Sequence, residues 1–348
     1  MLYFQRKLDS RPQSEKRENG SLQSLRQQLS EDGLSDGAIS LFQDSWRKET
    51  HKAYNTYIQQ YLEFLENLDS SSKKHPNHIK LANFLHHLYS KGSSYSTINL
   101  ARSAVSAYLS SSDCDSIGKH PVVCRIVKGV FENRPALPKY TEIWDVNLLL
   151  NHLAKIDFGV SLLKLAMKTA CLLLLTTGQR CQSIHSLKTK DIRFTSGKMV
   201  IYYSSLLKQS KPGTHVKPAE IPEFEVKSLC PVYHTKLYLD RTTDLRQSDG
   251  LFLSSMKPYN HISKDTFSRW IRTNIEEAGI QGFGPHSVRA ASSSAAAERL
   301  DIDKVLEAGG WNNVKTFAKF YRKDKVIDNK NKNNNFSQSV LDKFIRTH

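Results

Sequence analysis

The second half of this 348-residue chain contains residue types that could together attack a phosphodiester. In chain order they are Arg180, Lys211, His286, Arg289, Trp311 and Tyr321. A tyrosine hydroxyl becomes a useful nucleophile once it loses its proton. Attack on phosphorus builds negative charge on the phosphate oxygens, and fixed donors aimed at those oxygens are the largest expected source of rate. The set therefore suggests a tyrosine nucleophile among cationic donors.

Three members of the set carry positive charge and suit contact with a phosphate. Arg180 and Arg289 each offer a planar fork of donors that matches two phosphate oxygens and stays charged at any working pH. Lys211 could protonate the departing 5′ oxygen if neighbouring cations lower its pKa. The competing lysines are Lys198, Lys208 and Lys217. The choice between Lys211 and Lys208 stays open at this point.

The remaining members would assist the nucleophile. A phenol has a pKa of about 10, so Tyr321 needs neighbouring cations and His286 to help it lose its proton. The indole N–H of Trp311 can only donate, so we expect it to contact a phosphate oxygen. The rival tyrosines, none of which follows the second arginine, are Tyr202, Tyr203 and Tyr233. This scheme requires no metal ion and no other cofactor.

Each residue alone has a simpler explanation. A tyrosine on an amphipathic helix is usually packed or on the surface, and a tryptophan is usually part of a core. Arg180 could stabilise a helix end through the dipole. Lys211 could be a solvated hairpin lysine, and His286 could cap a helix. The ordered combination favours the catalytic interpretation.

The surrounding sequence predicts the elements that would position the first arginine and the lysine. Residues 162–175 are apolar nearly all round, which indicates a buried helix that ends at Gly178 and places Arg180 beside the core. Residues 199–203 and 220–222 flank a segment rich in Lys, Ser, Pro and Gly, which is typical of a β-hairpin with a long tip. Such a tip could carry Lys211 into a site.

Three further helices are predicted toward the end of the chain. One begins at Ser263 and is closed by Gly279. The second covers residues 286–300 after Pro285, and its spacing of three places His286 and Arg289 on one face. A short helix over residues 315–321 would present the tyrosine.

Composition favours a polyanionic partner. Lys and Arg number 50 against 34 Asp and Glu, which gives a net charge of +16 and favours salt-sensitive binding to phosphate backbones. No apolar run approaches the roughly 20 residues of a membrane helix, so no membrane partner is expected. The five cysteines form no C-x-x-C pair, which indicates neither a zinc module nor a disulfide framework.

The chain divides by composition into four segments. Residues 1–34 are polar and are predicted to be a disordered tail. Residues 35–137 show helical spacing and are predicted to form an all-helical domain. Residues 138–327 would contain the site. Residues 328–348 are predicted to be a polar linker followed by a short amphipathic helix.

The order Arg, Lys, His-x-x-Arg, Trp, Tyr resembles the tyrosine recombinase (phage integrase) family. The resemblance implies two domains: an all-α core-binding domain that clamps DNA, and a mixed α+β catalytic domain, mainly α with a small antiparallel sheet. It implies that Tyr321 forms a 3′-phosphotyrosyl link in double-stranded DNA with paired recombination sites, followed by Holliday-junction strand exchange and no cofactor. Residues of the first domain that could reach DNA, or could equally form a solvated face, are Ser94, Ser96, Thr97, Asn99, Arg102 and Lys128.

Finer features of the resemblance concern origin and assembly. The phrases around Arg180, Arg289 and Tyr321 look most like recombinases of DIRS and Ngaro-type retrotransposons, which implies integration of a mobile element and a nuclear location. Otherwise the location would be cytoplasmic or nucleoid. The C-terminal helix implies docking onto a neighbouring protomer in a dimer or tetramer, with docking onto its own chain as the alternative.

The chain departs from the family pattern in three places. Many members have Glu or Asp three residues after the first arginine, where this chain has Ser183, which puts the support of Arg180 in doubt. Trp311 replaces the commoner histidine, a variant that the family also uses. The spacing from Trp311 to Tyr321 is one residue longer than expected. Two other classes fit the sequence: a catalytically silent, domesticated DNA-binding protein and a type IB topoisomerase.

Overall fold

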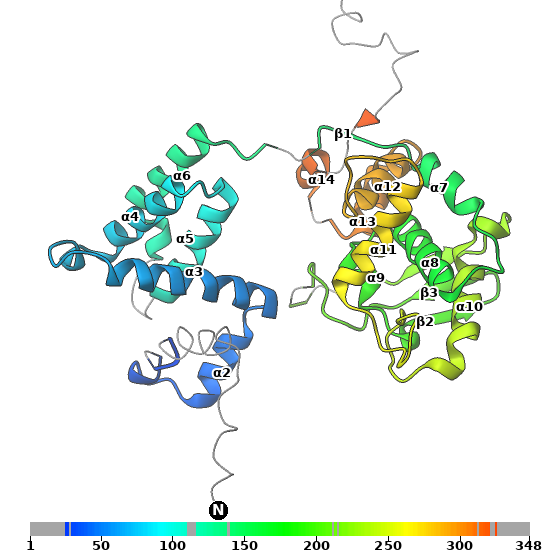
Figure 1. Cartoon of the computed structure of the whole chain (residues 1–348), viewed down its shortest axis with the longest axis horizontal. Helices are drawn as coiled ribbons and strands as arrows, with labels where there is room; N and C mark the ends of the chain where they lie inside the picture. The colour runs from blue at the N-terminus through cyan, green and yellow to red at the C-terminus, as the bar shows by residue number, and fades with distance from the viewer. Residues whose placement is uncertain are drawn as a thin grey trace, which may run out of the picture. The chain divides into compact units, whose positions relative to one another are not determined.

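The computed structural model describes residues 25–27, 29–109, 116–137, 140–210, 212–213, 216–311, 313–320 and 324–325. The chain forms two compact units that divide between residues 137 and 138 (Figure 1). Tyr321, Lys211 and the predicted C-terminal helix lie outside the described residues.

The described residues of the first unit form helices joined by short loops, with no strand among them. Its helices are α2 (Asp36–Asp44), α3 (Lys48–Glu66), α4 (Asn77–Ser90), α5 (Tyr95–Leu109) and α6 (Pro121–Asn133), with 3-10 turns at Ser72–Lys74 and Ile117–Lys119. The helical spacing of Leu81, Phe84, Leu85 and Leu88 puts all four on the buried face of α4. These side chains pack with Tyr61 of α3 and with residues of α5 and α6 in one core. The predicted all-α domain is confirmed.

The prediction of a disordered tail over residues 1–34 is wrong for its last part. Residues 25–27 and 29–31 are helical, and Leu25 and Leu29 are buried. They pack with Ile39 in a small cluster that also contacts Leu34 and Trp46. The spacing of four between Leu25 and Leu29 gives this polar segment an apolar edge, and α2 supplies the surface that covers it. Residues 1–24 lie outside the described part.

The second unit combines helices with two small sheets. Its helices are α7 (Val146–Ala154), α8 (Leu162–Thr177), α9 (Cys181–His185), α10 (Pro231–Thr242), α11 (Lys264–Glu277), α12 (Ser287–Ala297), α13 (Ile302–Gly309) and α14 (Val314–Phe320). Its strands are β1 (Glu142–Ile143), β2 (Ile192–Thr195), β3 (Lys198–Ile201), β4 (Ala219–Pro222) and β5 (Asp324–Lys325). Its 3-10 turns are Thr189–Asp191, Lys227–Leu229 and Thr243–Leu245.

The strands form an antiparallel sheet in the order β2-β3-β4 and a separate parallel pair, β1-β5. The predicted hairpin is confirmed as β3 and β4, in which Met199 pairs with Ile221. The sequence analysis missed β2 and the β1-β5 pair. In the pair, Glu142 lies opposite Asp324, so the first and last described strands of the unit are adjacent.

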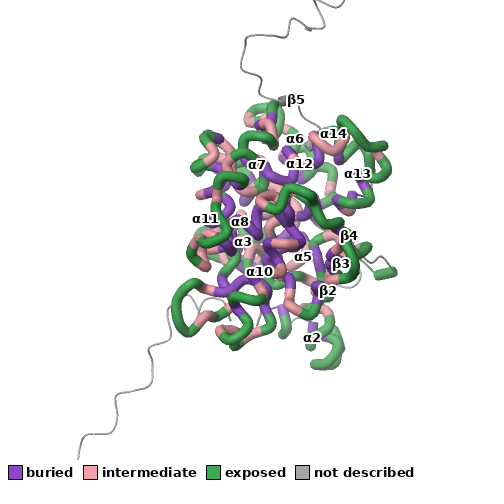
Figure 2. Tube along the Cα trace, turned by 90° about the vertical axis from the view of Figure 1, so that its right-hand side faces the viewer, coloured by how far each residue is buried: buried purple, intermediate pink, exposed green. Residues whose placement is uncertain are grey.

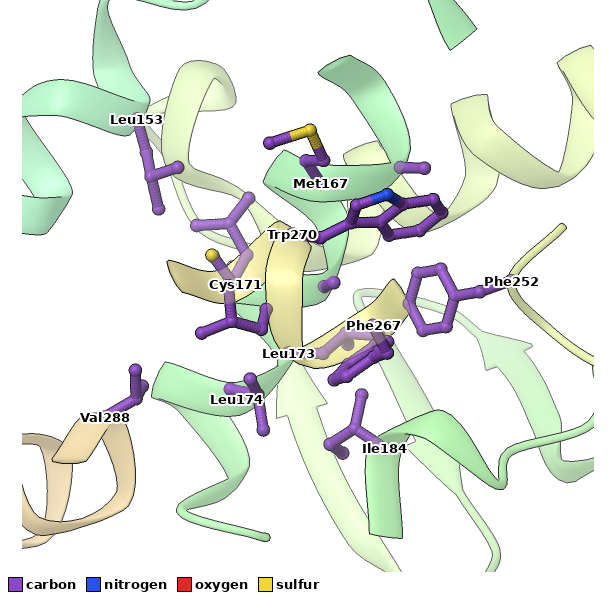
Figure 3. Packing of buried hydrophobic residues seen from close by; sticks show 14 of the residues in the cluster. Leu153, Met167, Cys171, Leu173, Leu174, Ile184, Phe252, Phe267, Trp270 and Val288 are labelled. Atoms are coloured by element: carbon purple, nitrogen blue, oxygen red, sulfur yellow. The ribbon is translucent and has the colours of Figure 1, made fainter. Parts of the chain in front are cut away.

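Helix α8 lies at the centre of the second unit, where it packs against α10, α11 and α12. It is buried over most of its length, which explains its apolar residues on every face (Figure 2). Figure 3 shows Leu173 of α8 near Phe267 of α11 and Ile184 of α9, within the same core. Gly178 ends α8 in the left-handed conformation, with φ of 59°.

Three further general features follow from the elements. The predicted fold class, an all-α domain followed by a mixed α+β domain with a small antiparallel sheet, is confirmed. The second of the three late helices ends earlier than predicted, at Ala297. Among the described helices, none combines the length and apolarity needed to cross a membrane.

We expect Phe267→Ala to lower the free energy of unfolding of the second unit by about 3–5 kcal/mol, because it opens a cavity in a closely packed core. Phe267 is fully buried and contacts the ring of Phe252 at a centroid distance of 5.3 Å. Phe224→Ala is the matched control, since Phe224 is 53% exposed and its loss should cost no more than about 0.5 kcal/mol. Urea denaturation measures both, and equal costs would contradict the packing described.

Candidate active site

Arg289 is a fully buried cation held between the ends of two helices. Its Nη1 donates to the Gly178 carbonyl at 2.7 Å, and its Nη2 donates to the Gly309 carbonyl at 2.7 Å. Gly178 follows the last residue of α8, and Gly309 is the last residue of α13. Carbonyls at helix C-termini carry partial negative charge, so both ends stabilise the guanidinium. Two of its five N–H bonds are thereby fixed in direction.

The indole ring of Trp311 covers Arg289. The guanidinium carbon lies 3.9 Å from the ring centroid, which is the geometry of a cation–π contact. Trp311 also meets Phe317 of α14 edge-on at 5.0 Å. The core explanation for this tryptophan therefore holds, because the ring packs on both α14 and Arg289, and contact of its N–H with a phosphate oxygen stays a prediction.

The glycine pair before Trp311 allows this arrangement. The N–H of Trp311 donates to the Leu306 carbonyl at 2.8 Å, and that of Gly310 donates to the Glu307 carbonyl at 3.0 Å. These two bonds form a Schellman motif, which requires the left-handed φ of 67° at Gly310. A side chain at Gly309 would overlap the Trp311 ring.

His286 stands at the N-terminal end of α12, where it precedes Arg289 by three residues as predicted. Desolvation by the surrounding protein lowers the pKa of His286 below 6.5, although part of the residue remains exposed. The charges of Arg289, Arg180 and Lys208 lower the pKa further. Three cations thus act on one imidazole. The ring is mainly neutral at pH 7 and can both donate and accept a hydrogen bond.

Arg180 is anchored by a residue that the sequence analysis did not identify. Its Nη1 donates to Gln209 Oε1 at 2.7 Å. Ser183, at the usual acidic position, is buried, and its backbone N–H donates to the Arg180 carbonyl at 2.8 Å. Arg180 is therefore supported by the side-chain amide of Gln209, which lies 29 positions further along the chain.

The competing lysines differ in their surroundings. Lys198 donates to Glu220 at 2.7 Å, and Lys217 pairs with Glu307. Lys208 is exposed, and its charge acts on His286. Two of the three competitors are thus held by carboxylates, and Lys208 is the competitor placed near the site.

The rival tyrosines also differ. Burial raises the pKa of Tyr203 well above its usual range, so that hydroxyl is a poor nucleophile. Tyr202 is exposed and faces the Arg193 guanidinium, whose carbon lies 4.9 Å from the ring centroid. Tyr233 lies on α10, next to His234. Their positions leave the assignment of Tyr321 as a prediction.

A hydrogen-bond chain missed by sequence reasoning fixes the start of α12. Trp144 Nε1 donates to Ser287 Oγ at 2.8 Å, and that hydroxyl donates to the Gly284 carbonyl at 2.7 Å. The Gly284 N–H donates to the Tyr140 hydroxyl at 3.1 Å. The segment before α7 therefore determines where the helix carrying Arg289 begins. No spacing rule in the sequence points to this long-range contact.

Comparison with known proteins assigns this chain to a family. The sequence pattern of the phage integrase family matches residues 141–326, which contain all six predicted catalytic residues. This chain belongs to the phage integrase family. The N-terminal SAM-like domain of phage integrases matches residues 40–111. No curated protein matches the sequence.

Several solved structures share the fold of this integrase-family chain. One is the XerH site-specific recombinase bound to palindromic difH substrate in a post-cleavage complex, with 21% identity, a TM-score of 0.56, and 76% of this chain and 74% of that chain covered. A lambda integrase dimer bound to a COC′ core site has 17% identity, a TM-score of 0.52, and coverage of 91% and 99%. The Tn1549 transposon integrase in complex with circular intermediate DNA has 17% identity, a TM-score of 0.53, and coverage of 93% and 98%. Because the identities are this low, the similarity to these structures shows a shared fold alone.

Five of the six candidate DNA-binding residues of the first unit lie on α5 and α6, and the sixth, Ser94, immediately precedes α5. Ser94 precedes α5, and its hydroxyl accepts the Thr97 N–H at 3.2 Å, so it caps the helix. Ser94, Ser96 and Lys128 are exposed, whereas Thr97, Asn99 and Arg102 are half-buried. The capping role is a structural explanation for Ser94, and DNA contact by all six stays a prediction.

We expect Gly309→Ala to destabilise the catalytic unit by about 1–3 kcal/mol, because the added methyl group forces the Trp311 ring away from Arg289. Gly129→Ala is the matched control. Gly129 lies within α6 with open space around the added methyl group, so that change should stabilise its unit by about 0.4–1 kcal/mol. Denaturation followed by tryptophan fluorescence measures both. An unchanged unfolding free energy in Gly309→Ala would contradict the close contact.

We expect the pKa of His286 to rise toward 6.5 in Arg180→Met and in Lys208→Met, because each change removes a positive charge that disfavours the protonated ring. Lys190→Met is the control, since Lys190 is exposed and is not among the charges acting on His286. Imidazole nitrogen NMR titration gives all the values. A His286 pKa that is the same in Lys208→Met and the wild-type protein would place Lys208 away from the site.

Proposed function

We propose that this protein is a DNA strand transferase that cleaves and rejoins duplex DNA through Tyr321, independently of metal. The observation that carries the proposal is the buried Arg289, held by two helix C-termini and Trp311, with His286 and the Arg180–Gln209 pair beside it. A cation directed in this way suits the charge that develops on a phosphate under attack. Membership of the phage integrase family supports the same reaction.

In the proposed reaction, the Tyr321 oxygen forms a bond to phosphorus and the bond from phosphorus to the 5′ oxygen breaks. Arg180 and Arg289 hold the non-bridging oxygens. A lysine, Lys211 or Lys208, gives its proton to the departing 5′ oxygen, while the neutral His286 ring accepts the Tyr321 proton and the cations stabilise the phenolate. The covalent bond conserves the energy, so the reverse attack by a 5′-hydroxyl rejoins a strand without a nucleotide cofactor.

Double-stranded DNA with paired sites is the proposed substrate. The net charge of +16 favours a phosphate backbone as partner. Similar folds include XerH on difH DNA, a lambda integrase dimer on a core site and a lambda integrase tetramer on a Holliday junction. We infer that this chain acts as a dimer or tetramer with strand exchange through such a junction, and that the helix predicted within residues 328–348 joins the protomers.

A role in integration of a mobile element is the proposed biological context. The similar Tn1549 integrase is a transposon protein. The sequence phrases around Arg180, Arg289 and Tyr321 support the finer proposal of a DIRS or Ngaro-type retrotransposon enzyme that acts in the nucleus.

The deciding experiment traps the covalent intermediate. The protein is incubated with a pool of nicked duplexes in EDTA and denatured, and the peptide joined to DNA is identified by mass spectrometry. We expect an adduct on Tyr321. Tyr321→Phe should abolish the adduct and keep DNA binding, because it removes only the nucleophilic oxygen. Tyr202→Phe, a change at an exposed tyrosine, should leave the adduct intact.

Other outcomes point to the other classes. A normal adduct in Tyr321→Phe would overturn the assignment of the nucleophile. Salt-sensitive binding without any adduct would indicate a silent DNA-binding protein. Relaxation of supercoiled DNA by a monomer, with no need for paired sites, would indicate a topoisomerase.

A further inference from the structure

We propose that Gln209 is the residue that positions Arg180 for the scissile phosphate, in place of the acidic residue that many family members carry three positions after this arginine. The inference rests on the proposed function. Gln209 contacts the guanidinium and not the phosphate, so it is a positioning residue. Three features support this role: the hydrogen bonds of Gln209, the restricted space around its side chain and the absence of a charge on its amide.

The first support is a chain of hydrogen bonds with one direction. Arg180 Nη1 donates to Gln209 Oε1 at 2.7 Å, and Gln209 Nε2 donates to Gln179 Oε1 at 3.0 Å. Gln179 Nε2 then donates to the Ala308 carbonyl at 2.8 Å, near the C-terminal end of α13. A guanidinium can only donate and a carbonyl can only accept, so both ends dictate the orientation of the two amides. The chain holds Arg180 to the element that leads to Trp311.

The second support is the confinement of Gln209. Its turn is closed by the Leu207 N–H, which donates to Ser210 Oγ at 3.0 Å, and by the Ser210 N–H, which donates to the Leu207 carbonyl at 2.9 Å. Leu207 is buried and anchors the turn. A methyl group at Gly310 would lie 3.2 Å from Gln209 Nε2, so glycine leaves room for this side chain. The closed turn and the nearby Gly310 backbone therefore restrict the position of the Gln209 amide.

The third support is electrostatic. Within the described residues, Arg180 forms no ion pair with a carboxylate, so its positive charge is not neutralised by a partner. A neutral amide fixes the direction of the guanidinium and leaves that charge available for a phosphate. Desolvation, Arg289 and then Arg180 lower the pKa of His286, and the effect of Arg180 agrees with a full positive charge on its guanidinium. Gln209 also adjoins Lys208, so one turn carries both the positioning amide and a candidate proton donor.

The test compares single-turnover cleavage of two nicked duplexes that carry the DNA sequence recovered in the trapping experiment. One has the natural phosphodiester, and the other has a methylphosphonate, which lacks the negative charge that Arg180 would stabilise. We expect Gln209→Ala to slow cleavage of the phosphodiester by about 10- to 10²-fold, because a misplaced arginine loses its alignment with the phosphate. On the methylphosphonate the same variant should lie within about 3-fold of the wild-type protein, since the charge contact is no longer needed.

Gln247→Ala is the matched control, because Gln247 is an exposed glutamine in a loop outside the site and should leave both rates unchanged. A merely structural effect of Gln209→Ala would slow both duplexes equally. Equal slowing, or no slowing on the phosphodiester, would overturn the proposal.

A second measurement separates this inference from the proposed function. NMR of the Arg180 guanidinium in the protein without DNA should show rotation about its Cζ–N bonds that is slow in the wild-type protein and in Gln247→Ala, and faster in Gln209→Ala. If the wild-type protein forms no adduct on any duplex, the proposed function fails, and this spectrum still decides whether Gln209 holds Arg180. Identical Arg180 spectra in the wild-type protein and Gln209→Ala would overturn the positioning role.

Discussion

The burial of the Arg289 charge is the constraint on which the rest of the catalytic unit depends. Taking a guanidinium out of water is costly unless its donors are paired and its charge is balanced by nearby dipoles. Here the balance comes from two backbone carbonyls and a tryptophan face. Each of these groups must lie within contact distance of the guanidinium. The ends of α8, α12 and α13 are therefore fixed relative to one another, and the glycines at 178, 309 and 310 supply the conformations and the space.

The amide relay extends the same principle to the first arginine. Two backbone carbonyls accept from Arg289 and a carboxamide accepts from Arg180, and these acceptors are uncharged. The site therefore keeps its positive charge while the direction of each guanidinium is fixed. The pKa of His286 is lowered because desolvation and the surrounding cations make a further positive charge unfavourable.

The sequence predicted those parts of the fold that follow from local rules. The apolar run over 162–175 with its terminal Gly178 identified α8, and Ser263 identified the start of α11, because helix periodicity and capping are short-range signals. The strands β1 and β5 were missed because a strand of two residues is too short to show an alternation of polar and apolar side chains. The two strands that pair are also far apart in the chain. The packing of Leu25 was missed for a similar reason, since α2 supplies its partner surface.

The site shows the same division. His286 and Arg289 could be placed together because a spacing of three on a helix is a local relation. Gln209 and Gln179 could not be identified, since an amide side chain carries no spacing signature and their contact spans 30 positions. The role of glutamine at 209 can be recognised only from its contacts with Arg180 and Gln179 and its closeness to Gly310.

The parallel pair of β1 and β5 has a consequence for how this unit can be exchanged between proteins. The two strands place residues 142–143 beside residues 324–325, so the entry and exit of the catalytic unit share one edge. The family match, residues 141–326, begins and ends within a residue of these strands. A module whose two ends emerge together can acquire a different N-terminal domain or a different tail while its interior stays unchanged. The β1–β5 pair thus lies at both ends of the part of the chain that matches the family.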